Sequence, residues 1–101
     1  MSRIVMIVLL TVSACSVSRP GEDDTGEEIY SQLCANCHAE DLSGGPLGPA
    51  IGPGSDSVAL PDAFFEFAIV NGRGSMPSFS QVLDEEQVDR LVEYIREVQE
   101  G

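Results

Sequence analysis

The chain has 101 residues, with 17 acidic side chains against five basic ones, and its formal net charge is −12. Every basic residue is an arginine, and the sequence contains no lysine. Nucleic acids and anionic lipid headgroups bind cationic protein surfaces, which so acidic a chain lacks. We therefore expect no nucleic-acid partner. The length predicts a single small domain, and a hydrophobic content of 43% argues against a disordered chain.

Residues 1–14 have the pattern of a secretory signal peptide. Arg3 precedes an apolar run over residues 4–10, and small residues follow that run. The alternative is an uncleaved membrane helix, but the run is much shorter than the roughly 20 apolar residues that span a bilayer. We therefore expect an exported protein.

Cys15 ends a Val12-Ser13-Ala14-Cys15 sequence that resembles a bacterial lipobox, in which the cysteine is lipidated and becomes the first mature residue. Ordinary signal peptidase could also cut after Ala14 and leave a soluble periplasmic protein with a free N-terminal thiol. We favour lipidation of Cys15, because acyl chains would anchor the protein to a membrane, facing the periplasm or the cell exterior.

Residues 15–24 contain proline, glycine and acidic residues without hydrophobic periodicity. They predict a lipidated N-terminus and a flexible linker to a domain over residues 25–101. The first helix of that domain is expected to begin near Thr25, because Thr25 and Glu28 have the spacing of a capping box.

Two further helices are predicted after a breaker-rich loop. Residues 43–57 contain five glycines and three prolines, which exclude a helix or a central strand there. A helix over residues 61–70 has Pro61 at its first position, and a last helix starts at Asp84, where Asp84 and Gln87 form a second capping box. The apolar stripe of the last helix comprises Val88, Leu91, Val92, Ile95 and Val98. With no convincing strand, the pattern indicates an all-α domain.

Cys34-Ala35-Asn36-Cys37-His38 is a C-x-x-C-H sequence, the attachment signature of c-type haem. Two thiols at this spacing lie on one side of a helical turn, where they can add to the two vinyl groups of haem. The next residue, His38, is then placed to bind the iron. Three other interpretations of the cysteines stay open: a thioredoxin-like redox pair, which needs a βαβ context, a zinc site, which needs four ligands, and a structural disulfide.

Met76 is the only methionine outside the expected signal peptide, and His38 is the only histidine in the sequence. If the iron has two protein ligands of the usual kinds, they are therefore His38 and Met76. Filling of the core is the alternative role for a lone methionine. Met76 lies in a loop rich in glycine and proline, over residues 72–82, which favours the ligand role.

Three segments resemble the class I cytochromes c: residues 26–38 (GEEIYSQLCANCH), residues 69–79 (IVNGRGSMPSF) and residues 91–95 (LVEYI). The resemblance implies three to four helices wrapped around one covalently bound haem, with long loops rich in glycine and proline. It also implies that the first and last helices cross, with Gly26 allowing a close approach.

The resemblance assigns further residues to the haem environment. It implies that a Gly-Pro carbonyl accepts the ring N–H of the proximal histidine, for which we favour Pro49 over Pro46. Arg73 is either a partner of a haem propionate or a solvated surface arginine. Phe79 is a candidate for the haem wall, together with Phe64 and Phe67.

The function expected from this resemblance is the transfer of one electron between membrane or periplasmic redox partners, not catalysis, because no acid–base or substrate-binding constellation is visible. The alternatives are a haem subunit of a larger oxidoreductase, a gas-binding haem sensor and a colourless zinc module. The sequence lacks the lysine-rich docking face of mitochondrial-type cytochromes c. Its acidity favours a redox partner with a basic docking face, although acidic runs are also common on solvated helix faces.

Overall fold

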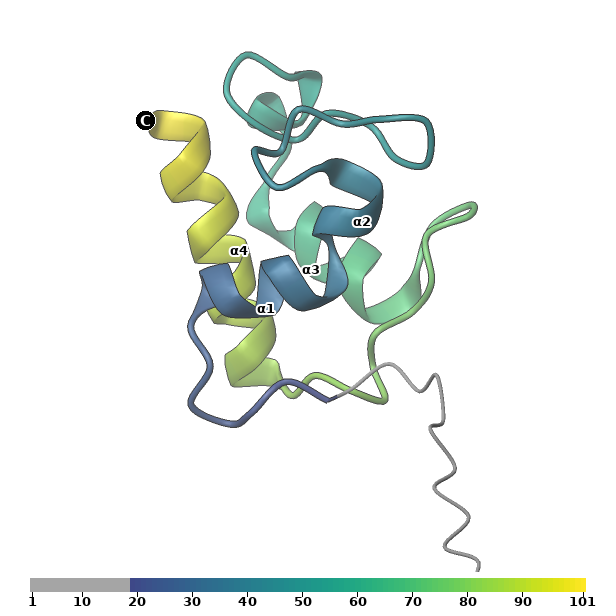
Figure 1. Cartoon of the computed structure of the whole chain (residues 1–101), viewed down its shortest axis with the longest axis vertical. Coiled ribbons are helices and arrows are strands. Elements are labelled where there is room, and N and C mark those ends of the chain that lie inside the picture. Colours follow the sequence, from purple (N-terminus) through teal and green to yellow (C-terminus); the bar gives the residue numbers. More distant parts are fainter. Residues whose placement is uncertain (1–18) are drawn as a thin grey trace, which may run out of the picture.

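The computed structural model describes residues 19–101, so the expected signal peptide and Cys15 lie outside the described residues. The described part is all-α, as the sequence predicts. It comprises α1 (Gly26–Leu33), α2 (Ala35–His38), the 3-10 helix η1 (Asp56–Ala59), α3 (Asp62–Asn71) and α4 (Glu85–Glu100). Long loops connect the helices, and α4 runs along one side of the domain across α1 and α3 (Figure 1). None of these helices is long and apolar enough to cross a membrane.

Both predicted capping boxes are present. The Thr25 hydroxyl accepts from the N–H of Glu28 at 3.1 Å, and the Glu28 carboxylate accepts from the N–H of Thr25 at 3.1 Å. Asp84 and Gln87 make the same reciprocal pair at 2.8 Å in each direction. These bonds satisfy backbone donors that have no partner inside a helix, so they fix where α1 and α4 begin.

Helices α1 and α4 approach each other closely at Gly26. A Cβ atom on Gly26 would lie 2.2 Å from the carbonyl oxygen of Arg90 and 2.7 Å from the Cβ of Tyr94. One turn further along α1, the ring of Tyr30 packs against that of Tyr94, with 5.6 Å between the centroids. The Tyr30 hydroxyl donates to the carbonyl of Ala39 at 2.7 Å, so this buried polar group has a partner. The expected crossing of the first and last helices is confirmed.

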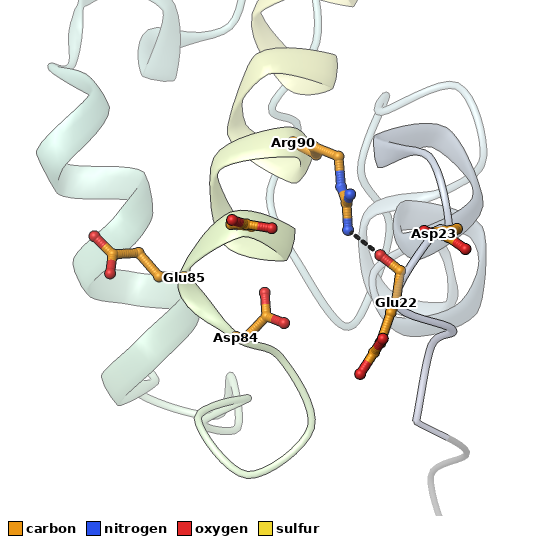
Figure 2. A pocket seen from close by; sticks show the side chains of 6 residues that line it. Glu22, Asp23, Asp84, Glu85 and Arg90 are labelled. Atoms are coloured by element: carbon orange, nitrogen blue, oxygen red, sulfur yellow. Dashed lines mark hydrogen bonds between the residues drawn. The ribbon is translucent and has the colours of Figure 1, made fainter.

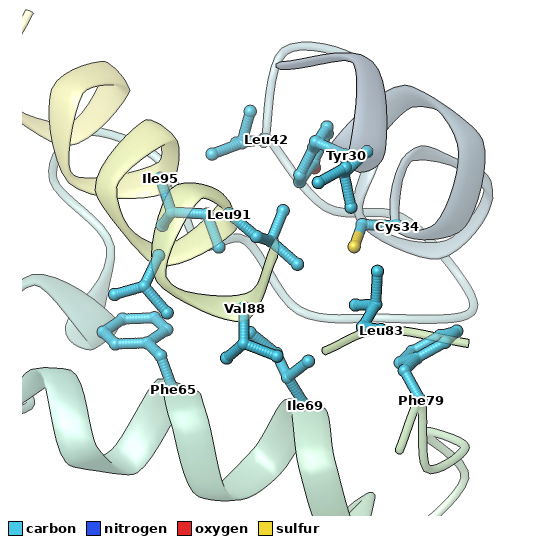
Figure 3. Close-up of a cluster of buried hydrophobic side chains, with 12 residues drawn as sticks. Tyr30, Cys34, Leu42, Phe65, Ile69, Phe79, Leu83, Val88, Leu91 and Ile95 are labelled. Atoms are coloured by element: carbon cyan, nitrogen blue, oxygen red, sulfur yellow. The ribbon is translucent and has the colours of Figure 1, made fainter. Parts of the chain in front are cut away.

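The hydrophobic core lies where α1, α3 and α4 meet (Figure 3). The apolar stripe of α4 faces inward as predicted, except that Val98 is only partly buried. The largest fully buried side chains are Tyr30, Ile29, Leu42 and Leu91. Leu42 comes from a loop that has no helical pattern, so periodicity gave no indication of its burial.

Helix α3 departs from the sequence prediction in two ways. Pro61 is the extended residue that precedes the helix, with φ −71° and ψ 158°, and is not its first helical residue; the helix continues to Asn71. Phe67 is 67% exposed, so it does not belong to the hydrophobic core, and its place in a haem wall stays a prediction. The buried face of α3 carries Phe65 and Ile69 instead.

The end of the breaker-rich segment also differs from the prediction. Its last two residues, Asp56 and Ser57, begin the 3-10 helix η1, which the glycine and proline content had argued against. η1 is a 3-10 helix of four residues, held by i→i+3 hydrogen bonds. So short a helix can form directly after a segment rich in glycine and proline.

Residues 20–24, assigned above to a flexible linker, are bound to the domain. The side-chain amide of Gln87 donates to the carbonyls of Pro20 at 3.4 Å and Gly21 at 3.2 Å. Arg90 donates to the carbonyl of Glu22 at 2.7 Å (Figure 2). The packed domain therefore begins near Pro20, which is itself buried, and not at Thr25.

Candidate functional site

The turn between α1 and α2 positions the C-x-x-C-H residues. Cys34 ends α1 and precedes α2, and its carbonyl accepts from the N–H groups of Cys37 at 3.2 Å and His38 at 3.0 Å. These bonds close one helical turn, so the two cysteines lie one turn apart on the same side. No disulfide joins Cys34 to Cys37, which excludes the structural-disulfide alternative for this pair.

The two thiols have different environments. Cys34 is 7% exposed and its sulfur points into the hydrophobic core (Figure 3), whereas Cys37 is half-buried. Burial, with a smaller contribution from the neighbouring Cys37, raises the pKa of Cys34 to about 12. Before any thioether forms, the Cys34 thiol is therefore protonated at neutral pH and is a poor nucleophile for disulfide exchange.

His38 has a defined tautomer. Its Nδ1 atom lies 2.7 Å from the carbonyl oxygen of Pro49, and since a carbonyl oxygen can only accept, Nδ1 carries the proton. Nε2 of the neutral ring then keeps its lone pair and can bind a metal ion. Between the two candidates, Pro49 and Pro46, the structure uses Pro49 for this hydrogen bond, as we favoured.

The glycine-rich loop packs directly against the motif. A Cβ atom on Gly48 would lie 3.0 Å from the carbonyl oxygen of Cys37, and one on Gly44, where φ is +81°, would lie 2.5 Å from the nitrogen of Ala50. A larger residue at Gly48 would push the loop away from α2, and one at Gly44 would clash with the backbone of the loop itself. The glycines therefore allow the Pro49 carbonyl to reach His38.

Met76 lies in a tight turn that Arg73 closes. The N–H of Arg73 donates to the carbonyl of Met76 at 3.1 Å, and the N–H of Met76 donates to the carbonyl of Arg73 at 2.9 Å. The guanidinium of Arg73 lies over the ring of Phe64, 4.9 Å from its centroid. This cation–π contact ties the methionine turn to α3. Phe64 had been assigned to a haem wall, and its contact with Arg73 was not foreseen.

Phe79 lies at the base of the same loop. It is 8% exposed, belongs to the buried cluster that contains Cys34, and its N–H donates to the carbonyl of Ile69 at 2.9 Å. The structure thus joins His38 to Pro49, and Arg73 to Met76 and Phe64. It places Phe79 and Cys34 in one core.

The donor set suits a covalently bound haem. Two thiols on one turn can form thioethers, an imidazole nitrogen with a free lone pair can bind iron, and a thioether sulfur is available in a loop pinned by two backbone hydrogen bonds. Sequence reasoning missed two polar residues of α4: Gln99, which binds Ile51 in the loop that contains Pro49, and Arg96, which binds η1 and the residues after it and also contacts Gln99. Both residues lie outside the apolar stripe of α4, so the hydrophobic pattern of the sequence did not predict these contacts.

The known proteins that resemble this chain are cytochromes. The family model described as cytochrome c oxidase, cbb3-type, subunit III matches residues 21–95. The chain is 25% identical over 87 residues to the cytochrome c subunit of 4-cresol dehydrogenase (hydroxylating) from Pseudomonas putida. The aligned region covers 85% of this chain and 71% of that subunit. The chain is 43% identical over 54 residues to cytochrome c-551 of Bacillus subtilis (strain 168), covering 52% of this chain and 44% of that protein.

A solved structure shows the same fold. Cytochrome cL from Hyphomicrobium denitrificans matches with a TM-score of 0.65 and 28% identity, over 73% of this chain and 45% of that one. The chain thus spans less than half the length of this relative and of cytochrome c-551. Because the family model covers most of the chain, the protein belongs to that cytochrome family and is a small class I c-type cytochrome, an electron-transfer protein with covalently bound haem c.

Proposed function

We propose that Cys34 and Cys37 hold the haem through thioethers and that His38 and Met76 are its two axial ligands. The observation that carries this assignment is the hydrogen bond from Nδ1 of His38 to Pro49, which leaves Nε2 free to bind iron. When bound, the haem supplies a reversible one-electron couple. The chain's own residues fill both axial positions, which favours electron transfer over ligand binding or catalysis.

Arg73 and Phe79 complete the proposed haem environment. The Arg73 side chain is exposed, and its contact with Phe64 holds the guanidinium beside the methionine turn. A cation held there can pair with a haem propionate. Phe79 supplies apolar surface beside Cys34, which would keep water away from the haem.

We also propose that Cys15 is lipidated and anchors the cytochrome to a membrane. The lipobox-like residues 12–15 support this proposal. Anchoring would confine the domain to the membrane surface and so raise its effective concentration near membrane-bound partners.

The proposed partner is a redox protein with a basic docking face. Carboxylates from the N-terminal segment and the start of α4 surround a hollow of about 500 Å³ (Figure 2). A second groove, between α3 and α4, has an apolar floor that includes Val70, Leu83 and Val88, and its charged residues are all acidic: Glu66, Asp84, Glu85 and Asp89. Such a surface attracts a cationic partner and repels an anionic one.

A second candidate role is that of a permanent cytochrome subunit in a larger oxidoreductase. The similarity to the cytochrome subunit of 4-cresol dehydrogenase supports it. Purification of the intact, haem-loaded protein in mild detergent separates the two roles. A stoichiometric partner that remains bound indicates a subunit, and a free cytochrome indicates a mobile carrier.

Optical spectroscopy of haem-loaded protein tests the ligand assignment. We expect a low-spin spectrum with a sulfur–iron charge-transfer band in the oxidised state and no rapid change when CO is added to the reduced state. A high-spin or CO-reactive haem would instead support a sensor with an open sixth position.

A further inference from the structure

The last two turns of α4 are bound to η1, to α3 and to the loop whose Pro49 carbonyl accepts from His38. Arg96 donates to the backbone carbonyls of Val58, at 3.3 Å, and Leu60, and it pairs with Asp62 at 2.8 Å. Its guanidinium also lies 4.5 Å from the ring centroid of Phe65. Arg96 is therefore fixed by contacts with η1, α3 and the segment between them.

Arg96 in turn fixes the orientation of Gln99. An Arg96 N–H donates to Oε1 of Gln99 at 2.8 Å. Because a guanidinium has donors only, the oxygen of the Gln99 amide must face Arg96 and its NH2 group must point the other way. That NH2 group donates to the carbonyl of Ile51 at 2.9 Å and to the hydroxyl of Ser57 at 3.2 Å. The amide thus has a partner for its oxygen and for both N–H bonds.

Ile51 is held from two sides. Its carbonyl accepts from Gln99, while its N–H donates to the carbonyl of Leu42 at 2.9 Å. The Leu42 carbonyl also accepts from Gly52 at 3.0 Å. Ile51 lies two residues after Pro49, whose carbonyl accepts the ring N–H of His38. The hydrogen bond from Gln99 to the Ile51 carbonyl therefore connects α4 to the loop two residues from Pro49.

We propose that Gln99 is a positioning residue for His38. By binding Ile51, Gln99 holds the Pro49 carbonyl at hydrogen-bond distance from Nδ1, and so controls how strongly His38 donates electrons to the iron. The proposal rests on the proposed assignment of His38 as an axial ligand. It links the C-terminal turn of the chain to the reduction potential of the haem.

The test uses haem-loaded protein with the substitutions Gln99→Glu and Gln99→Leu. Gln99→Glu keeps the shape and the acceptor for Arg96 but places a carboxylate oxygen opposite the Ile51 carbonyl, so the donor is lost while the fold is retained. The matched control is Gln32→Leu, since the Gln32 amide also donates two hydrogen bonds, to Asp24 and Glu28, far from the loop.

The first measurement is hydrogen exchange of the His38 Nδ1–H proton by NMR in the reduced protein. We expect exchange to accelerate by about fivefold or more in both Gln99 variants, because the Nδ1–H bond to Pro49 is loosened, and to be unchanged in Gln32→Leu. The second is the reduction potential, which should rise in Gln99→Leu as His38 becomes a weaker donor.

The possible outcomes are distinct. If His38 ring signals in the wild type show no ligation to iron, the proposed ligand set itself fails. If His38 is ligated and Gln99→Glu exchanges like the wild type, the positioning role is overturned. Equal acceleration in Gln32→Leu would also overturn it, because the effect would then report general loosening of the fold.

Discussion

At the scale of single residues, one hydrogen bond decides the chemistry of the site. Pro49 accepts the Nδ1 proton of His38, which selects the tautomer whose Nε2 can bind iron. Met76 is held by two backbone bonds to Arg73, so its loop is fixed even though its side chain is partly exposed. His38 and Met76, each held by a different loop, are therefore expected to set the ligation and the reduction potential of the haem.

Replacement of Met76 by alanine should open the sixth position of the iron. We expect the sulfur–iron band to disappear, CO to bind rapidly to the reduced protein and the reduction potential to fall, because a thioether ligand favours ferrous iron. Leu47→Ala is the control, since Leu47 is an exposed loop residue and should leave the spectrum unchanged. An unaltered spectrum in Met76→Ala would remove Met76 from the coordination sphere.

Replacement of Cys37 by alanine should leave at most one thioether. Cys37 is half-buried on the same turn as Cys34, so the change removes a thiol without opening the core. Mass spectrometry of protein made with haem-maturation machinery should show less covalent haem, or none, and the haem that remains should be attached through Cys34. Undiminished covalent haem with two thioethers would exclude Cys37 as an attachment site.

At the scale of elements, capping and close packing place the helices. The two capping boxes fix the starts of α1 and α4, and Gly26 lets those helices touch. Their contact supports the turn that carries the haem motif, because Tyr30 and Cys34 extend from α1 into the same core. The stability of the crossing therefore bears directly on the site.

Gly26→Ala should destabilise the domain strongly. The new Cβ would lie 2.2 Å from a backbone carbonyl oxygen, which cannot rotate away as a flexible side chain could. We expect a loss of about 3 kcal/mol or more in the free energy of unfolding, measured with urea. Gly21→Ala is the control, because its Cβ would meet only the flexible Asp24 side chain at 3.1 Å. Equal stability of the two variants would contradict the close approach of α1 and α4.

At the scale of the whole molecule, charge and attachment determine which partners the cytochrome can meet. The net charge of −12 is spread over helix faces and around two surface hollows. Within the packed domain, residues 20–24 bind α4, so the segment between the proposed lipid anchor and the domain is shorter than the sequence suggested.

Electron exchange with a basic partner should depend on salt. With a lysine-rich mitochondrial-type cytochrome c as the probe, we expect the second-order rate constant to fall severalfold as ionic strength rises, since screening weakens the attraction between opposite charges. Stopped-flow absorbance measures this rate. A rate that is constant or increases with salt would show that the acidic surface does not guide docking.

Cys15→Ser should release the cytochrome from membranes. Fractionation of cells that express the full chain should move the haem protein from the membrane pellet to the soluble fraction, while the haem spectrum stays the same. Continued sedimentation with membranes would mean that something other than a lipid on Cys15 holds the protein there.

The sequence by itself determined the features that depend on neighbours along the chain. The haem motif, both capping boxes and the inward face of α4 all arise from spacings of a few residues, which helix geometry converts directly into positions in space. Tertiary structure alone decided between Pro49 and Pro46, attached residues 20–24 to α4, exposed Phe67 and joined Gln99 to Ile51. Apart from the exposure of Phe67, these points were decided by hydrogen bonds that join backbone carbonyls to side chains 11, 48, 66 and 68 residues away. Every residue has a carbonyl, so the sequence carries no mark of which one a distant donor will reach until packing brings the two together.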